Sequence, residues 1–208
     1  MFVAGGDTDR VYRYSTVGYS LSSASYDAQR LDVSGEDTDP RGVKFNGDGT
    51  KMFVTGTDND NVYSYNLSTA YDLSSATYNQ SLDVSGQDAY PTGMTFNGDG
   101  TKMFVVGQKT DSVYSYNLST AYDLSTASYN QSFDVSGLDD LPRGVTFNGD
   151  GTKMFVSGES NENIYSYNLS TAYDISSASY NQSFDVSGQD TGPTGMTFNG
   201  DGTKMFVV

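Results

Sequence analysis

The sequence contains no cysteine, no histidine and no tryptophan, and only four of its 208 residues are proline. Without cysteine there is neither a disulfide framework nor thiolate chemistry. Without histidine, the Ser-His-Asp and Cys-His catalytic arrangements are excluded and zinc sites are disfavoured. No apolar run approaches the roughly 20 residues that a membrane-spanning helix needs.

Positive charge is also scarce, because 11 Lys and Arg residues stand against 26 Asp and Glu residues, for a net charge of −15. A nucleic-acid-binding protein needs a positive surface, and none is visible here. An anionic membrane surface would repel such a chain. We therefore expect neither nucleic acid nor a membrane as a partner, whereas the charge suits solubility, divalent cations or cationic partners.

What the sequence does have is an internal repeat of 51 residues. Its four prolines are evenly spaced, at Pro40, Pro91, Pro142 and Pro193. The segment Phe-Asn-Gly-Asp-Gly-Thr-Lys-Met-Phe-Val occurs four times with the same spacing. A fixed period near 50 residues is typical of propellers and solenoids. The repeat is therefore stronger evidence for the fold than any local sequence pattern.

Each period predicts four short strands, named a to d. In the first complete period we expect them at 42–45, 51–55, 62–66 and 77–84. The Asn-Gly-Asp-Gly turn between a and b is a strong hairpin signal, with both glycines suited to positive φ. Tyr63 and Tyr65 share one face of strand c and are expected in the core between blades. In strand d, Tyr78 and Leu82 are expected on one face with Val84.

These strands predict an all-β protein, namely a β-propeller of four-stranded antiparallel blades with four blades per chain. Both faces of such a blade carry apolar side chains, and neighbouring blades around an axis would cover them. A β-solenoid is the alternative, although it would not need tight hairpins. We treat 1–208 as one domain, with blades at 1–39 (completed by 193–208), 40–90, 91–141 and 142–192.

The two ends of the chain carry the same strand. Met1-Phe2-Val3 recurs as Met205-Phe206-Val207, four periods later. The last segment is therefore expected to complete the first blade, with one strand in excess. A compact four-bladed monomer and an eight-bladed ring shared by two chains around a two-fold axis both remain open. We favour the homo-oligomer.

The stretch 91–105, Pro-Thr-Gly-Met-Thr-Phe-Asn-Gly-Asp-Gly-Thr-Lys-Met-Phe-Val, resembles the YVTN repeat of bacterial, archaeal and viral β-propellers. The following Val-Tyr-Ser-Tyr resembles its third strand, while the loop Leu-Ser-Thr-Ala-Tyr-Asp-Leu-Ser-Ser-Ala is longer than usual. Repeats with this longer loop are similar to those of marine bacterial and phage-associated surface or tail proteins. The resemblance implies a propeller fold and favours an extracellular or virion-surface location. For function it implies only a range, from lactonase-like enzymes and quinoprotein-like domains to surface-layer and adhesive modules.

Two connections differ between the repeats, while the a–b turn and the c–d loop hardly change. The variable segments are the b–c turns 4–10, 55–61, 106–112 and 157–163, and the d–a connections 36–39, 87–90, 138–141 and 189–192. In a four-stranded meander both connections leave the blade at the same end. We therefore expect one variable face, and loops on a rigid scaffold are where binding residues are usually placed.

Several polar residues of this face are candidates for binding a ligand. They are Asp9, Asp37, Asp60, Asp88, Tyr90, Asp111, Asp139, Glu162, Asp190, Arg41 and Arg143. The acids that precede strand c, which are Asp9, Asp60, Asp111 and Glu162, could hold Ca²⁺, an ion that takes about six to eight oxygen ligands. No Asp-x-Asp-x-Asp-Gly loop occurs, and each acid could instead accept backbone N–H bonds within its turn.

Arg41 and Arg143 start strand a in two repeats, where Thr92 and Thr194 stand in the other two. Salt bridges and the lining of a central channel are the two roles considered for them. The sequence as a whole favours a non-catalytic binding or structural module with an unknown protein or glycan ligand and no cofactor beyond a possible Ca²⁺. The alternatives are a lactonase- or glycosidase-like hydrolase that uses Asp or Glu, and an inert repeat spacer.

Overall fold

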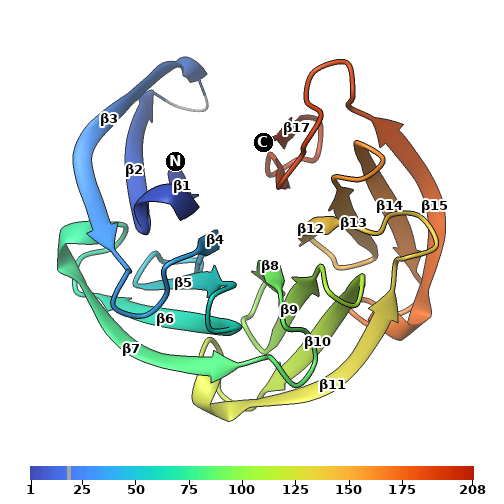
Figure 1. Cartoon of the computed structure of the whole chain (residues 1–208), viewed down its shortest axis with the longest axis horizontal. Helices are drawn as coiled ribbons and strands as arrows, with labels where there is room; N and C mark the ends of the chain where they lie inside the picture. Colours follow the sequence, from blue (N-terminus) through green and yellow to red (C-terminus); the bar gives the residue numbers. More distant parts are fainter. Residues whose placement is uncertain (18–19) are drawn as a thin grey trace.

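The four repeats fold into antiparallel blades around a common axis, as a four-blade β-propeller (Figure 1). The computed structural model describes residues 1–17 and 20–208, and these contain seventeen strands and four 3-10 turns of three residues each. The predicted all-β class and blade architecture are confirmed. Within these same two segments, no helix is long and apolar enough to cross a membrane.

Three blades are complete four-stranded sheets. They are β4 (Pro40–Phe45), β5 (Lys51–Gly56), β6 (Asn61–Leu67) and β7 (Ala76–Asp83), then β8 (Pro91–Phe96), β9 (Lys102–Gly107), β10 (Ser112–Leu118) and β11 (Ala127–Asp134), and then β12 (Pro142–Phe147), β13 (Lys153–Gly158), β14 (Asn163–Leu169) and β15 (Ala178–Asp185). The expected strands lie within two residues of the observed ones. In each blade the first strand lies nearest the axis and the fourth lies at the rim (Figure 1).

The two ends of the chain carry incomplete blades. The first sheet has three strands, which are β1 (Phe2–Gly5), β2 (Arg10–Val17) and β3 (Ser20–Asp32). At the other end, β16 (Met196–Phe198) and β17 (Met205–Val207) form a two-stranded sheet. Within the described residues these two strands pair with each other and with no strand of the first sheet.

The a–b turn owes its shape to polar side chains and one glycine. The Asp48 carboxylate accepts a hydrogen bond from the Thr50 amide at 2.9 Å. The carbonyl of Asn46 accepts one from the Gly49 amide at 3.1 Å. Gly49 has φ +74°, whereas Gly47 is not among the residues with positive φ, so only one of the two turn glycines needs this conformation. A Cβ on Gly49 would meet the ring of Tyr71, which lies over the turn.

Strand d contains a β-bulge that the alternation in the sequence does not reveal. Tyr78 pairs with Tyr65, but Gln80 pairs with the preceding residue Ser64, so Asn79 is the extra residue. The side-chain Nδ2 of Asn79 donates to the Ser64 hydroxyl at 3.2 Å. Tyr78 and Leu82 therefore lie on opposite faces of the blade, and the prediction that they share one face was wrong.

The core consists of apolar layers between adjacent blades. Phe104 is fully buried, and its ring lies 4.3 Å from that of Phe147 in the next blade. The strand-c tyrosines of the complete blades lie in the same layers with at most 7% exposure, which confirms their predicted role in the core. Fully burying a Phe side chain stabilises the fold by about 1.5–3 kcal/mol, so the apolar layers between blades contribute strongly to stability.

Glycine lets the innermost strands approach one another at the axis. A Cβ on Gly93 in β8 would lie 2.6 Å from the carbonyl oxygen of Arg143 and 3.2 Å from the Cα of Gly144 in β12. A side chain at Gly93 would therefore push these strands apart. This close packing fixes where Arg143 and the neighbouring residue Thr92 lie relative to the axis.

Aspartate in turns accounts for much of the acidic composition and predicts acid sensitivity. In ten aspartates, hydrogen bonds from the Ser or Thr two residues later lower the carboxyl pKa below the ordinary 3.8. A lowered folded-state pKa stabilises the fold above pH 3.8 and loses that contribution as pH falls through the folded value.

We therefore expect the urea midpoint to fall as the pH is lowered below 3.8 toward the lowered pKa values. Asp99→Asn is the matched control, because asparagine still accepts the hydrogen bonds of the turn but does not titrate. This variant should lose a share of the pH dependence while it keeps most of its stability at neutral pH. A midpoint that does not change with pH over this range would contradict the assignment.

Candidate functional site

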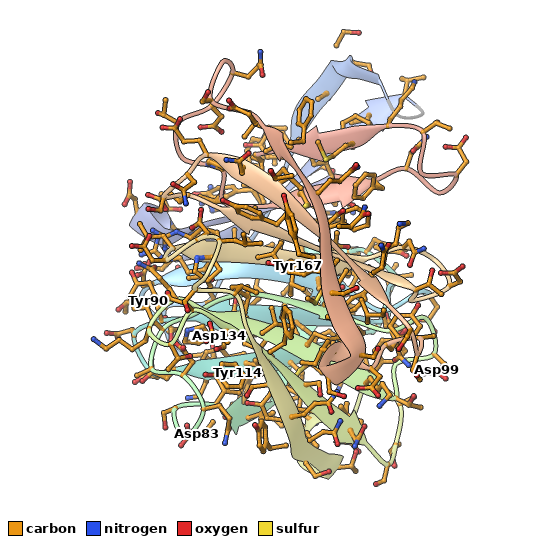
Figure 2. All side chains as sticks on the ribbon, turned by 90° about the vertical axis from the view of Figure 1, so that its right-hand side faces the viewer. Asp83, Tyr90, Asp99, Tyr114, Asp134 and Tyr167 are labelled. Carbon is orange, nitrogen blue, oxygen red and sulfur yellow. The ribbon has the colours of Figure 1, made fainter. Side chains whose placement is uncertain are left out.

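The b–c turns and the d–a connections form one face of the disc. The Asp39 carbonyl accepts from the Thr57 amide at 3.2 Å, and the Tyr90 carbonyl accepts from the Gln108 amide at 3.0 Å. Figure 2 shows Tyr90 at one edge of the molecule and Asp99, in an a–b turn, at the opposite edge. The connections that vary between repeats therefore meet on one side, which we call the variable face.

Three of the candidate acids are buried and hold this face together. Asp37, Asp88 and Asp139 have at most 2% exposure. Asp139 accepts from the backbone amides of Leu141 at 2.9 Å, Ser160 at 3.3 Å and Asn161 at 3.0 Å. Its carboxylate thus ties its own d–a connection to the adjacent b–c turn. Asp190, the fourth of the series, is half-buried and accepts from the Gly192 amide at 2.9 Å.

The acids that precede strand c also shape the b–c turns through their backbone conformation and hydrogen bonds. Asp9, Asp60, Asp111 and Glu162 adopt left-handed φ values of 50° to 54°. Each backbone carbonyl accepts from a valine amide after strand d, as Asp60 does from Val84 at 3.0 Å. The structure puts one such acid on each blade. In residues 1–17 and 20–208, no three acidic side chains are grouped so that they could hold a metal ion.

Burial acts on two of these carboxyls. It raises the pKa of Asp60 above 3.8, and the negative charges of Asp88 and Asp83 add to the effect. It likewise raises the pKa of Asp111, with Asp140 as the next cause. Negative charge is therefore concentrated around the start of strand c in these two blades, away from the residues that line the axis. Calcium at these positions stays a prediction.

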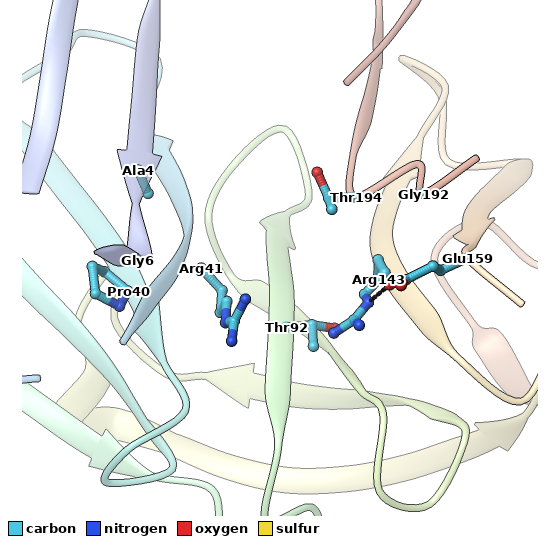
Figure 3. A pocket seen from close by; sticks show the side chains of 9 residues that line it. All are labelled: Ala4, Gly6, Pro40, Arg41, Thr92, Arg143, Glu159, Gly192 and Thr194. Carbon is cyan, nitrogen blue, oxygen red and sulfur yellow. Dashed lines mark hydrogen bonds and ion pairs between the residues drawn. The ribbon is translucent and has the colours of Figure 1, made fainter. Parts of the chain in front are cut away.

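A cavity opens on the variable face where the innermost strands meet at the axis. Its volume is about 340 Å³, within the range of roughly 300–1,000 Å³ that is common for small-molecule sites. It is lined by Ala4, Gly6, Pro40, Arg41, Thr92, Arg143, Glu159, Gly192 and Thr194. Figure 3 shows the Arg41 and Arg143 side chains extending into the same space, one on each side of Thr92.

Arg41 is held by polar contacts to the d–a connections before and after its blade. Its Nη2 donates to the Asp39 carboxylate at 2.6 Å and to the Tyr90 hydroxyl at 3.0 Å. The guanidinium carbon also lies 5.8 Å from the centre of the Tyr90 ring, which is a cation–π contact. With a side chain 38% exposed, Arg41 forms the solvent-facing side of the cavity.

Arg143 is the more buried of the two, with 16% of its side chain exposed. Its Nε donates to the Glu159 carboxylate, and its Nη1 donates to the side-chain oxygen of Gln108 in the preceding blade. The predicted salt bridges of both arginines are thus present. Among the described residues, no hydrogen bond or ion pair is made by Nη2 of Arg143 or by Nε and Nη1 of Arg41.

The chemistry of this arrangement is that of an anion site. Two guanidinium groups are fixed by contacts on one side and keep N–H donors directed into a shared cavity. Arginine N–H donors match the two oxygens of a carboxylate, and such charge-assisted hydrogen bonds are among the strongest in proteins. The cavity brings Arg41 and Arg143 together, whereas Asp9, Asp60, Asp111 and Glu162 do not line it.

Sequence reasoning missed Glu159 and Gln108. They occupy the same position of the b–c turn in consecutive repeats, 51 residues apart, and both contact Arg143. Their place in the variable b–c turn could have suggested them, because the backbone amide at this position of the turn donates to a carbonyl of the d–a connection. Their identity as partners of Arg143 depends on how adjacent blades are placed.

No family model matches the chain, and no curated protein matches it in sequence. Solved structures are similar to it in fold. One is a 6-phosphogluconolactonase-like protein from Bacteroides uniformis, with a TM-score of 0.62 and 10% identity over 96% of this chain and 57% of that one. A second is a protein from Lactobacillus plantarum, with a TM-score of 0.62 and 16% identity over 96% of this chain and 61% of that one.

A third similar structure is the β-propeller domain of Cps50 (Swd1) from Myceliophteria thermophila. Its TM-score is 0.54 at 11% identity, over 81% of this chain and 49% of that one. This chain thus spans less than two thirds of each of these structures. The likeness covers lactonase-like and non-enzymatic propellers alike, and what it shows is that this chain has the β-propeller fold.

Proposed function

We propose that this protein is a non-catalytic binding module of the YVTN type, whose variable face binds a glycan that carries carboxylate groups. The ligand's carboxylate lies in the axial cavity between Arg41 and Arg143. Its hydroxyl groups contact the surrounding loops, which differ from blade to blade. Such a ligand suits a protein at a cell or virion surface.

The observation that carries the proposal is the pair of arginines in the axial cavity. A chain of net charge −15 would repel anions at most of its surface. It nevertheless directs N–H donors of two guanidinium groups into one cavity of about 340 Å³. Each guanidinium uses only part of its N–H groups in its hydrogen bonds and ion pairs, so both keep donors for an anion in this cavity.

The same cavity argues against the hydrolase alternative. Glycoside hydrolysis uses two carboxyl groups on either side of the scissile bond. Among the residues that line the cavity, Glu159 is the one carboxylate, and Arg143 holds it in an ion pair. An inert spacer, the other alternative, would need neither arginine. Resemblance in fold to a lactonase-like protein does not assign its chemistry to this chain.

The test is calorimetric titration with oligosaccharides that contain uronic acid and with neutral oligosaccharides of the same length. We expect binding of the acidic series alone. Arg143→Gln should weaken it by roughly tenfold or more, since charge-assisted hydrogen bonds are lost.

Lys109→Gln is the matched control, because it removes one exposed positive charge from the same face but outside the cavity. We expect it to leave the affinity within about twofold, since exposed charges contribute little. Equal binding of neutral and acidic sugars, equal losses in the two variants, or no binding at all would contradict the proposal.

A further inference from the structure

The two ends of the blade array expose apolar faces that are covered everywhere else in the molecule. In the third repeat, Phe133 of β11 is partly buried and its ring lies 5.2 Å from that of Tyr167 in the next blade. Its equivalent in the last complete blade, Phe184 of β15, is 59% exposed. This difference in exposure comes from the position of the strand in the blade array, because β11 and β15 have identical sequences.

A groove of about 250 Å³ marks the uncovered face of this last blade. Its lining is Phe155, Ile164, Ser166, Gln182, Ser183, Phe184, Phe198, Gly202, Thr203 and Met205. In the preceding blade, the equivalent layer around Phe133 is covered by strand c and the c–d loop of the following blade, through Tyr165, Tyr167 and Ile175. Phe155 already packs on Phe198 of β16, with ring centres 4.6 Å apart, so strand c and the c–d loop of a following blade are what the groove lacks.

The first sheet exposes the opposite, matching face. Met1 is 49% exposed and Val3 is 39% exposed. Their equivalents one repeat later, Met52 and Val54, are at most 1% exposed because the first sheet covers them. Figure 1 shows β2 and β3 on one side of an opening in the ring and β15 on the other.

Polar groups at the two ends match as well. Between complete blades, the Tyr116 hydroxyl donates to the Gln87 side chain at 3.0 Å. The residues at the same repeat positions across the opening are Tyr14 on the first sheet and Gln189 after the last complete blade. Gln189 is exposed, and a first sheet placed on the last blade would give it the Tyr14 hydroxyl as a donor.

The half-buried Asp190 likewise lacks donors that its equivalents in the other repeats have. Its equivalent Asp37 accepts from the Asn59 amide at 3.1 Å and from the Tyr63 hydroxyl at 3.2 Å. The matching donors, 51 residues earlier, are the Thr8 amide and the Tyr12 hydroxyl of a first sheet. The uncovered end therefore offers both the apolar surface and the hydrogen-bond acceptors that a first sheet would satisfy.

From this complementarity we propose that two copies of this chain associate head to tail, with β1–β3 of a second copy packed on the exposed face of β12–β15. β16 becomes the innermost strand of the shared blade. β1 of the second copy takes the place of β17, whose Met-Phe-Val sequence it repeats. A two-fold axis covers both ends of both chains in this way and closes the ring.

The arc of the blades favours a second copy over closure within one chain. No strand of β16–β17 pairs with β1–β3 in the part of the chain that the structure describes. The four blades also superpose over 96% of their length on 57% of a longer propeller chain. The four blades thus correspond to a little more than half of that longer propeller chain. This inference goes beyond the proposed function and does not depend on it.

Light scattering of the 208-residue chain tests the association. We expect a mass of about twice the 22.4 kDa of one chain. Phe184→Glu should weaken association by roughly 100-fold, since it places a charge in a desolvated apolar contact. Tyr180→Glu is the matched control on the same strand. Tyr180 is 51% exposed, and its equivalents Tyr78 and Tyr129 are both 49% exposed in covered blades, so this position lies outside the contact.

Cross-linking then tests whether the first sheet of one copy contacts the last complete blade of the other. Because the chain has no native cysteine, only the introduced cysteines can react. A mixture of Phe184→Cys and Tyr14→Cys chains, treated with a short bis-maleimide, should give a cross-linked dimer. Either variant alone should give none. The proposal would be overturned by a monomeric wild-type chain, or by dimers that Phe184→Glu leaves intact. It would also be overturned by a cross-link between two copies of the same single-cysteine variant. A cross-link within one chain that carries both cysteines and stays monomeric would overturn it as well.

Discussion

Replacement of Asp139 by alanine is expected to lower the free energy of unfolding by about 3–4 kcal/mol, because several backbone amides lose a buried, charged acceptor at once. The donors are the backbone amides of Leu141, Ser160 and Asn161, whereas the Tyr165 hydroxyl keeps the Leu138 carbonyl as an acceptor at 2.9 Å. For a chain of this size, the melting temperature should fall by roughly 10 °C.

The neighbouring residue supplies the control for this variant. Asp140 is exposed and carries the same charge, so Asp140→Ala should change stability by less than about 0.5 kcal/mol. Chemical denaturation of both variants makes the comparison. Similar losses in the two would mean that the burial of Asp139 in the turn is not what stabilises the variable face.

Phe104→Ala is expected to have an effect at least as large, of about 3–5 kcal/mol. Phe104 is fully buried and contacts two rings of the next blade, at 4.3 Å from Phe147 and 6.3 Å from Tyr173. Its removal leaves a cavity between two rigid sheets, and these cannot collapse without separating the glycine-packed strands at the axis.

Tyr129→Ala is the control for the loss of an aromatic ring in the same blade. Tyr129 lies at the rim and is 49% exposed, so we expect a cost of about 1 kcal/mol or less. Urea unfolding of the two variants would distinguish them. Equal losses would contradict the view that the layers between blades, and not the sheets themselves, stabilise the fold.

Much of the fold could be predicted because the repeat shows the same local chemistry four times. The spacing of Pro40 and its equivalents fixed the blade length, and the Asn-Gly-Asp-Gly turn fixed the first hairpin. The bulge at Asn79 could not be predicted, since one extra residue in strand d leaves the apolar pattern nearly unchanged. The 3-10 turn Leu73–Ser75 was also missed, although the Asp72 side chain accepts from the Ser74 amide at 3.0 Å and caps it.

The candidate site could be predicted only in part. Variation among the repeats located the face, and Arg41 and Arg143 were recognised by their alternation with threonine. Their partners Tyr90 and Gln108 lie 49 and 35 residues away in sequence. Such pairs depend on the placement of adjacent blades around the axis, which no local pattern encodes. For the same reason, the sequence did not show that Arg41 and Arg143 share a cavity.

The measurement that tests this account most directly is an NMR titration with an acidic oligosaccharide, followed at the arginine side-chain N–H groups and at the backbone amides. We expect the signals of Arg41 and Arg143 to shift together with the variable-face loops around the cavity. The amides of the Asn-Gly-Asp-Gly turns, on the opposite face, should not move. Shifts confined to those turns, or arginine signals that do not change while the sugar binds, would contradict the placement of the ligand at the axis.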